Sequence, residues 1–190
     1  MPNTLKRWPT SICAFATQSL ALVSLPFLLQ GAFSMPVTET GFVIAAWPLL
    51  VAVMAVVVAP LSDRYPSGLL CSVGLILLTL GMVLLATMGS GASSLGIAVR
   101  LGVCGIGFGL FQSPNMREIM NGATGARSGG ASAVVAISRL MGQTLGAGLV
   151  AQCFHLWPVS GARMALCLGG ACALLGCIFS TMRLKKRASI

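Results

Sequence analysis

Charge is what this sequence has least of. Charged residues make up 8% of its 190 residues, whereas a typical soluble domain carries about 25%. Hydrophobic residues make up 56% of the chain, and its mean hydropathy is +0.94. A chain with so few charges cannot cover a water-facing surface, so the composition excludes a soluble domain.

Acidic residues are scarcer still, since Glu39, Asp63 and Glu118 are the only three. The formal net charge is +9, which raises the question of a nucleic-acid partner. Proteins that bind nucleic acids gather Lys and Arg on one face or stripe. Here the basic residues sit in short segments between apolar blocks, as membrane topology produces. The distribution therefore predicts no nucleic-acid partner.

Residues that commonly carry chemistry are also few. The chain has one histidine, His155, and seven cysteines without a Cys-x-x-Cys pair. Metal sites and disulfide frameworks need closer or more exposed spacings than these. No Ser/His/Asp set or phosphate-binding loop is visible either, so we expect no enzyme activity, no metal and no cofactor.

Long apolar blocks are what the sequence does contain. Each is about as long as the roughly 20 residues that a helix needs to cross a bilayer. They predict an all-α membrane protein in which residues 1–190 form one six-span transmembrane domain. The spans cover about 10–30, 41–61, 69–89, 93–113, 130–153 and 163–183.

The basic residues also predict an orientation, because Lys and Arg accumulate on the cytoplasmic side. With the N-terminus inside, only Arg163 lies outside, and both termini are cytoplasmic. The basic residues then inside are Lys6, Arg7, Arg64, Arg117, Arg127, Arg183, Lys185, Lys186 and Arg187. The basic C-terminal tail would also attract anionic lipid, which makes the bilayer the first expected partner.

Two arginines, Arg100 and Arg139, fall inside predicted spans, where a charge is costly. They either join helices by pairing with carbonyls or line an aqueous path that binds substrate. The amides of Gln18 and Gln143 leave the same choice open, since such groups usually form interhelical hydrogen bonds. Trp47 either packs or offers its ring face to an organic cation. These five residues are our candidates for the substrate pathway.

Glycines four residues apart indicate where helices approach closely. Gly105 and Gly109 form one such pair, and Gly142 and Gly146 form another. Prolines interrupt the first two spans, as happens near the binding sites of transporters.

Three segments together carry a family resemblance. They are Ala59-Pro-Leu-Ser-Asp63-Arg64-Tyr-Pro-Ser-Gly68, Gly107-Phe-Gly-Leu-Phe-Gln-Ser-Pro-Asn115 and Ser138-Arg139-Leu-Met-Gly142-Gln-Thr-Leu-Gly146. The first resembles the Asp-Arg loop of the major facilitator superfamily, which makes Asp63 and Arg64 a candidate conformational-switch loop. In this order the segments resemble the last six spans of the fourteen-span drug:proton antiporter branch, close to exporters of methyl viologen and quaternary ammonium compounds.

The resemblance implies one half-bundle of a major facilitator fold, built from an inverted pair of three-helix repeats. It implies the C-terminal half of a proton-coupled efflux permease for drugs or organic cations, in the inner membrane of a bacterium. Such a half needs a partner, either the missing N-terminal half or a second copy of the chain. A half-size transporter acting as a homodimer and a non-transporting membrane remnant or scaffold remain alternatives.

Overall fold

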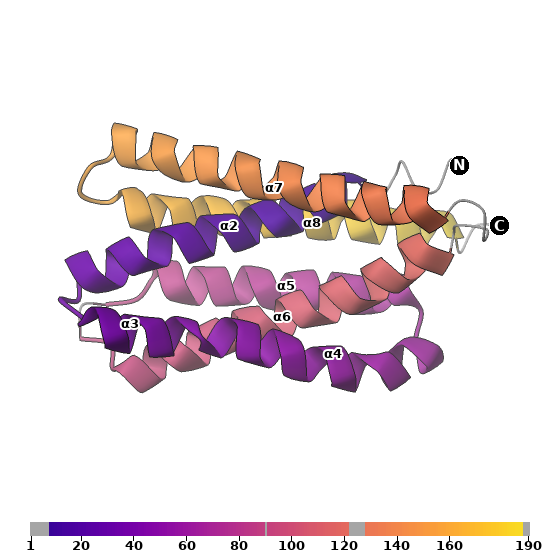
Figure 1. Ribbon diagram of the computed structural model, residues 1–190, viewed down its shortest axis with the longest axis horizontal. Helices are drawn as coiled ribbons and strands as arrows, with labels where there is room; N and C mark the ends of the chain where they lie inside the picture. Colours follow the sequence, from indigo (N-terminus) through magenta and orange to yellow (C-terminus); the bar gives the residue numbers. More distant parts are fainter. Residues whose placement is uncertain (1–7, 90, 122–127, 188–190) are drawn as a thin grey trace.

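The computed structural model describes residues 8–89, 91–121 and 128–187, and the described residues form helices joined by short connections. Figure 1 shows the helices lying roughly along one axis. Their bounds are α2 Trp8–Gly31, α3 Val37–Ile44, α4 Ala46–Arg64, α5 Ser67–Ala86, α6 Ser94–Asn121, α7 Ser128–Leu156 and α8 Gly161–Arg187. Within these residues there is no strand.

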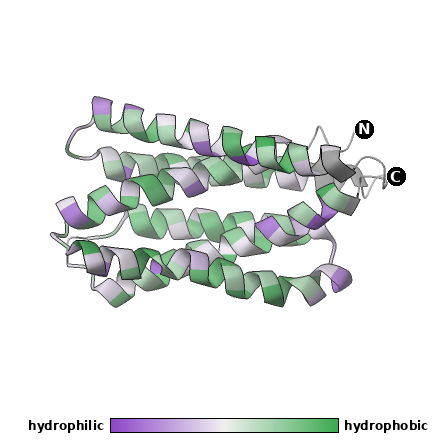
Figure 2. Cartoon of the chain, viewed as in Figure 1, coloured by the Kyte–Doolittle hydropathy of each residue, from purple (hydrophilic) through white to green (hydrophobic). Residues whose placement is uncertain are grey.

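Six segments are long and apolar enough to cross a membrane. Five of them are single helices, and the sixth combines α3 and α4 into one span over Val37–Arg64. Figure 2 shows hydrophobic residues along the whole length of the bundle, with hydrophilic ones at helix ends and at a few positions within the helices. The predicted all-α fold with six transmembrane helices is confirmed.

Several helices extend beyond the spans predicted from hydropathy, and two of these extensions carry acidic residues. The second span begins at Val37, so Glu39 lies in the first turn of α3. The fourth continues through Ser113 to Asn121, so Glu118 is helical. Hydropathy ends a span where polar residues begin, but a helix satisfies its own backbone and can continue into water.

Proline explains the boundary between α3 and α4. Pro48 has no backbone N–H to donate to the carbonyl of Ile44, and its ring crowds that carbonyl. The helix is interrupted at Ala45, although Leu49 N still donates to Ala45 O at 3.1 Å. Pro26, by contrast, lies within the uninterrupted helix α2.

The bundle consists of two groups of three helices. In one group α2 packs against α7 and α8, and in the other α6 packs against α4 and α5. The packing of α5 against α8 joins the groups, and Ser72 Oγ donates to Ser180 Oγ at 2.9 Å between these two helices. The arrangement around α2 thus repeats around α6, as an inverted repeat requires.

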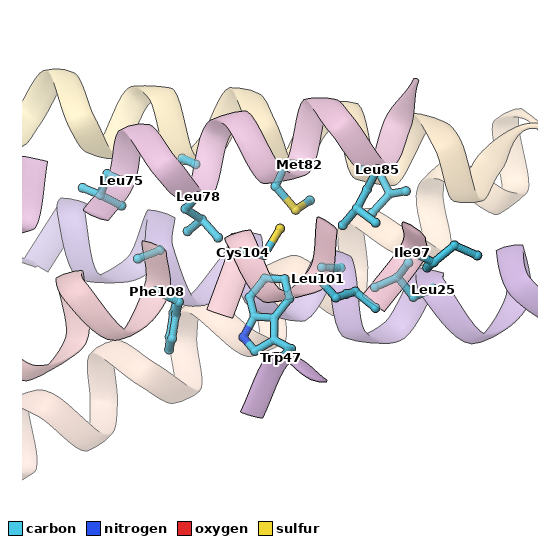
Figure 3. Close-up of a cluster of buried hydrophobic side chains, with 14 of the residues drawn as sticks. Leu25, Trp47, Leu75, Leu78, Met82, Leu85, Ile97, Leu101, Cys104 and Phe108 are labelled. Atoms are coloured by element: carbon cyan, nitrogen blue, oxygen red, sulfur yellow. The ribbon is translucent and has the colours of Figure 1, made fainter. Parts of the chain in front are cut away.

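The largest buried cluster lies where α2, α5, α6 and α8 meet, and α4 contributes Trp47 to it. Figure 3 shows Leu75, Leu78, Met82 and Leu85 of α5 facing the same cluster as Leu101, Cys104 and Phe108 of α6. Trp47 lies in this cluster with 1% of its surface exposed, and its ring centroid is 6.3 Å from that of Phe108.

The predicted glycine pairs lie at close helix contacts. A Cβ at Gly105 would lie 2.6 Å from the Trp47 carbonyl oxygen, and one at Gly109 would lie 2.5 Å from Met54 Cβ. On α7, a Cβ at Gly142 would lie 2.7 Å from the carbonyl oxygen of Ile12 on α2. Because the obstacles include backbone atoms, these contacts leave no room for a side chain.

Gly146 allows a matched test of this packing. A Cβ there would lie 2.6 Å from the Ala16 carbonyl oxygen, whereas one at Gly148 on the same helix meets nothing within 4 Å. We expect Gly146→Ala to lower the free energy of unfolding by about 1–3 kcal/mol, the usual cost of overpacking. Gly148→Ala should leave it unchanged or raise it slightly. Thermal unfolding in detergent measures both, and equal melting temperatures would contradict the close packing of α7 on α2.

Candidate functional site

A cavity of about 310 Å³ opens on the face of the bundle formed by α2, α4, α6 and α7. Its volume is within the range that drug-sized ligands occupy. Its polar lining consists of Gln18, Gln112, Ser113 and Arg139. Its other lining residues are Phe15, Leu22, Trp47, Pro48, Val51, Ala52 and Ala55.

A second hollow of about 600 Å³ adjoins the first. Phe15, Gln112 and Arg139 line both, so the two form one continuous groove. The second hollow adds Met116 and Met120 of α6 and Gln143 of α7 to the lining. Beside it, Asn115 Nδ2 donates to Ser11 Oγ at 3.1 Å, which ties α6 to α2. We call the two hollows together the groove.

Arg139 is the only charged side chain that lines either hollow of the groove, within the described part of the chain. It lies seven residues beyond Ser132, the first residue of the fifth span, which is about 10 Å into that span at 1.5 Å per residue. The side chain is exposed to the groove. Among the described residues it has no hydrogen bond or ion pair within reach.

The other pathway candidates fall into two groups. Gln18 and Gln143 are half-buried and line the groove. Trp47 also lines it, but with 1% of its surface exposed it offers little ring face to a cation in this conformation. Its buried indole Nε1 has no hydrogen-bond partner among the described residues.

Arg100 lies elsewhere and lines neither hollow. Its Nη1 donates to the carbonyl oxygen of Gly96 on the same helix at 3.1 Å. The structure therefore brings together Arg139, Gln18, Gln143 and Trp47 but not Arg100. Among the groove residues that the sequence analysis did not single out are two polar ones beside Arg139, namely Gln112 and Ser113. Their polarity within the motif that ends at Asn115 was the available signal.

The predicted switch loop is part of a helix. Asp63 and Arg64 form the last turn of α4, because Pro66 disfavours helical geometry at Tyr65. Tyr65 is accordingly extended, with φ −120° and ψ 146°. Asp63 Oδ1 accepts a hydrogen bond from Arg117 Nη1 at 2.9 Å, which ties α4 to α6. Both side chains are at least half exposed, so this ion pair contributes little stability.

The described acidic residues lie away from the groove. Glu39 accepts a hydrogen bond from Ser94 at the opposite end of the bundle from the Asp63 pair. Neither hollow has Asp63 or Glu118 in its lining. The described residues contain no group of His, Cys, Asp and Glu that could hold a metal ion.

Six apolar helices, with a partly polar groove on the face formed by α2, α4, α6 and α7, define a multi-pass membrane protein of the transporter type. Comparison with known proteins agrees, because the sequence profile of the Major Facilitator Superfamily matches residues 7–189. The chain therefore belongs to the major facilitator superfamily.

Several curated relatives are similar to parts of this chain. An uncharacterized transporter of Escherichia coli K12, YebQ, is 37% identical over 95% of the chain and 39% of its own length. The multidrug resistance protein Stp of Mycobacterium tuberculosis is 28% identical over 77% of the chain and 27% of its own length. The riboflavin transporter RibZ of Clostridioides difficile is 23% identical over 75% of the chain and 31% of its own length. The chain thus spans less than half the length of these relatives.

Proposed function

We propose that this chain supplies the C-terminal half of a proton-coupled exporter of drugs and organic cations in the inner membrane of a bacterium. The groove carries the proposal, because it places polar side chains and a drug-sized volume on one face of an apolar bundle. The resemblance of its three motifs to drug:proton antiporters supports the choice of cargo. So does the similarity to Stp, which is named a multidrug resistance protein.

The exposed helices indicate that the bundle needs a partner on the groove side. Only 17% of the most apolar stretch of the α3–α4 span and 22% of that of α7 is buried, against 61% for α2. Alternating access in this family moves two six-helix bundles about a site between them. In our proposal the second bundle covers α4 and α7 and closes the groove.

A complementation experiment tests the proposal. The chain would be co-expressed with the part of YebQ that it does not match, in an Escherichia coli strain lacking its own drug exporters. We expect the pair to raise the inhibitory concentration of methyl viologen, and the YebQ part alone to have no effect. Co-expression that assembles in the membrane but gives no resistance to methyl viologen or quaternary ammonium compounds would contradict the proposal.

A homodimer of half-size transporters is the second candidate. The same exposed faces of α4 and α7 would then cover each other across a two-fold axis. The homodimer would close the groove, but it would not bring a carboxylate to membrane depth, since Glu39, Asp63 and Glu118 all lie near helix ends. That absence is why we rank the split transporter above the homodimer, and the groove is why we rank a non-transporting scaffold last.

The orientation in the membrane is a separate prediction. In a variant with the seven native cysteines replaced, Val159→Cys should react with a membrane-impermeant maleimide added to intact cells. Tyr65→Cys should react only after the cells are permeabilised. Both positions are exposed at opposite ends of the bundle, and the basic residues predict that the Tyr65 end is cytoplasmic. Labelling of Tyr65→Cys in intact cells would contradict cytoplasmic termini.

A further inference from the structure

The groove has a charge of one sign and no counterion. Arg139 is exposed in it without an ion pair among the described residues, and the acidic side chains lie away from its lining. An arginine at membrane depth is costly unless an anion or water-filled space accompanies it. The chain therefore keeps an unpaired cation where a cargo would lie.

Hydrogen-bonding groups surround this cation. The amides of Gln18 and Gln112 and the hydroxyl of Ser113 line the same hollow as Arg139, and Gln143 lines the adjoining one. Each of these side chains can donate to an oxygen anion. A guanidinium binds a carboxylate with two parallel hydrogen bonds, which makes it suited to this group in particular.

Apolar and aromatic surface lies beside the polar groups. Phe15 lines both hollows, and Trp47, Leu22 and Val51 line the first. The indole N–H of Trp47 is a buried donor without an acceptor among the described residues. Phe15 and Trp47 are 5% and 1% exposed, so the accessible apolar surface is that of the half-buried Leu22 and Val51. A ligand with an apolar body could therefore lie against these two residues and present an oxygen anion to Arg139.

We propose that Arg139, Gln18, Gln112 and Ser113 form a subsite for the carboxylate of a ligand with an apolar body. This inference rests on the proposed function, because it takes the groove as part of the cargo path, and it names a substrate class for that path. The cargoes favoured by this half of the site are apolar compounds that carry a carboxylate, with or without a cationic amine. A simple organic cation would meet Arg139 as a like charge, so in this proposal the other half of the transporter holds the cationic cargoes of the proposed function.

A matched pair of probes tests the subsite. Radiolabelled 2-naphthoate and 2-naphthylmethylammonium share a ring system and differ in the sign of their charge. Equilibrium dialysis against the purified full chain in nanodiscs, with empty nanodiscs subtracted, gives the affinity for each. We expect 2-naphthoate to bind at least about tenfold more tightly than the cation, as one charge-assisted hydrogen-bonded pair provides.

Variants identify the residue responsible. Arg139→Gln should weaken 2-naphthoate binding about tenfold, and Arg139→Lys should weaken it less, because lysine keeps the charge but not the planar pair of donors. The matched control is Arg163→Gln, which removes one positive charge at the other end of the bundle, beside Met88. It should leave binding unchanged. Arg139→Lys also serves if the glutamine variant fails to fold.

The proposal would be overturned by tighter binding of the cation than of 2-naphthoate, by equal binding to wild type and a folded Arg139 variant, or by equal losses in the Arg139 and Arg163 variants. A wild-type chain that binds no 2-naphthoate, but needs Arg139 to assemble with the YebQ part, would assign the arginine to a carboxylate of the partner half. Export of methyl viologen without 2-naphthoate binding would overturn this inference but not the proposed function. Binding of 2-naphthoate without export of methyl viologen would overturn only the proposed function.

Discussion

The purified chain in liposomes is expected to show no uncoupler-sensitive efflux of ethidium or methyl viologen. Proton-coupled exchange usually needs a carboxylate or histidine at membrane depth that binds a proton and cargo in competition. Glu39 and Asp63 lie in the first and last turns of the second span, and Glu118 lies in the last turn of α6. At these helix ends a carboxylate does not compete with cargo in the groove.

The measurement is dye movement in vesicles with an imposed proton gradient, with and without an uncoupler. Vesicles that contain the chain together with the unmatched part of YebQ serve as the positive control. Efflux by the lone chain at a rate similar to that of the pair would overturn this expectation. It would also promote the homodimer over the split transporter.

Loss of the groove cation should have the second large effect. Arg139→Ala is expected to lower export of 2-naphthoate by the reassembled transporter at least about tenfold, because it removes a charge-assisted interaction worth about 1.5–3 kcal/mol. Arg139→Lys should retain part of the activity unless the partner is planar and bidentate. Arg139 has no hydrogen bond to the described residues, so we expect the variants to fold. Export rates are compared at equal membrane abundance, so that a difference reports on transport and not on folding.

Ser138 provides the contrast on the same helix. It is 1% exposed, and its Oγ donates to the Val134 carbonyl within α7. Ser138→Ala removes only this local bond, so export should change by less than about twofold. If Arg139→Ala exported as well as Ser138→Ala does, the groove would not be the cargo path that we propose.

The sequence predicted the membrane helices well because hydropathy and length decide them. Composition excluded a soluble chain, and each apolar block corresponds to one span of the bundle. The ends of the helices were harder to predict, since nothing in the hydropathy of Ser113–Asn121 shows that this polar stretch continues α6. The prediction that prolines interrupt the first two spans was only partly informative, because the helix is interrupted near Pro48 but continues through Pro26.

The candidate site shows the same division. A charged or amide side chain in an apolar span was enough to single out Arg139, Gln18 and Gln143. Which of them share a groove depends on how α2, α6 and α7 pack, and a sequence without that packing cannot separate Arg139 from Arg100. The pairing of Asp63 with Arg117 was also out of reach, because it joins residues from different helices.

The close glycine contacts have a consequence for how this protein can diversify. Gly74 and Gly107 meet backbone to backbone between α5 and α6, with a Cβ on either lying under 2.7 Å from the other helix. Every substitution at such a position adds atoms that clash with the other helix, so any sequence change there lowers the stability of the bundle. Groove positions on α4 and α7, such as Ala52 and Ala136, face open space instead. New cargo preferences can therefore arise by substitution in the groove while the scaffold behind it stays unchanged.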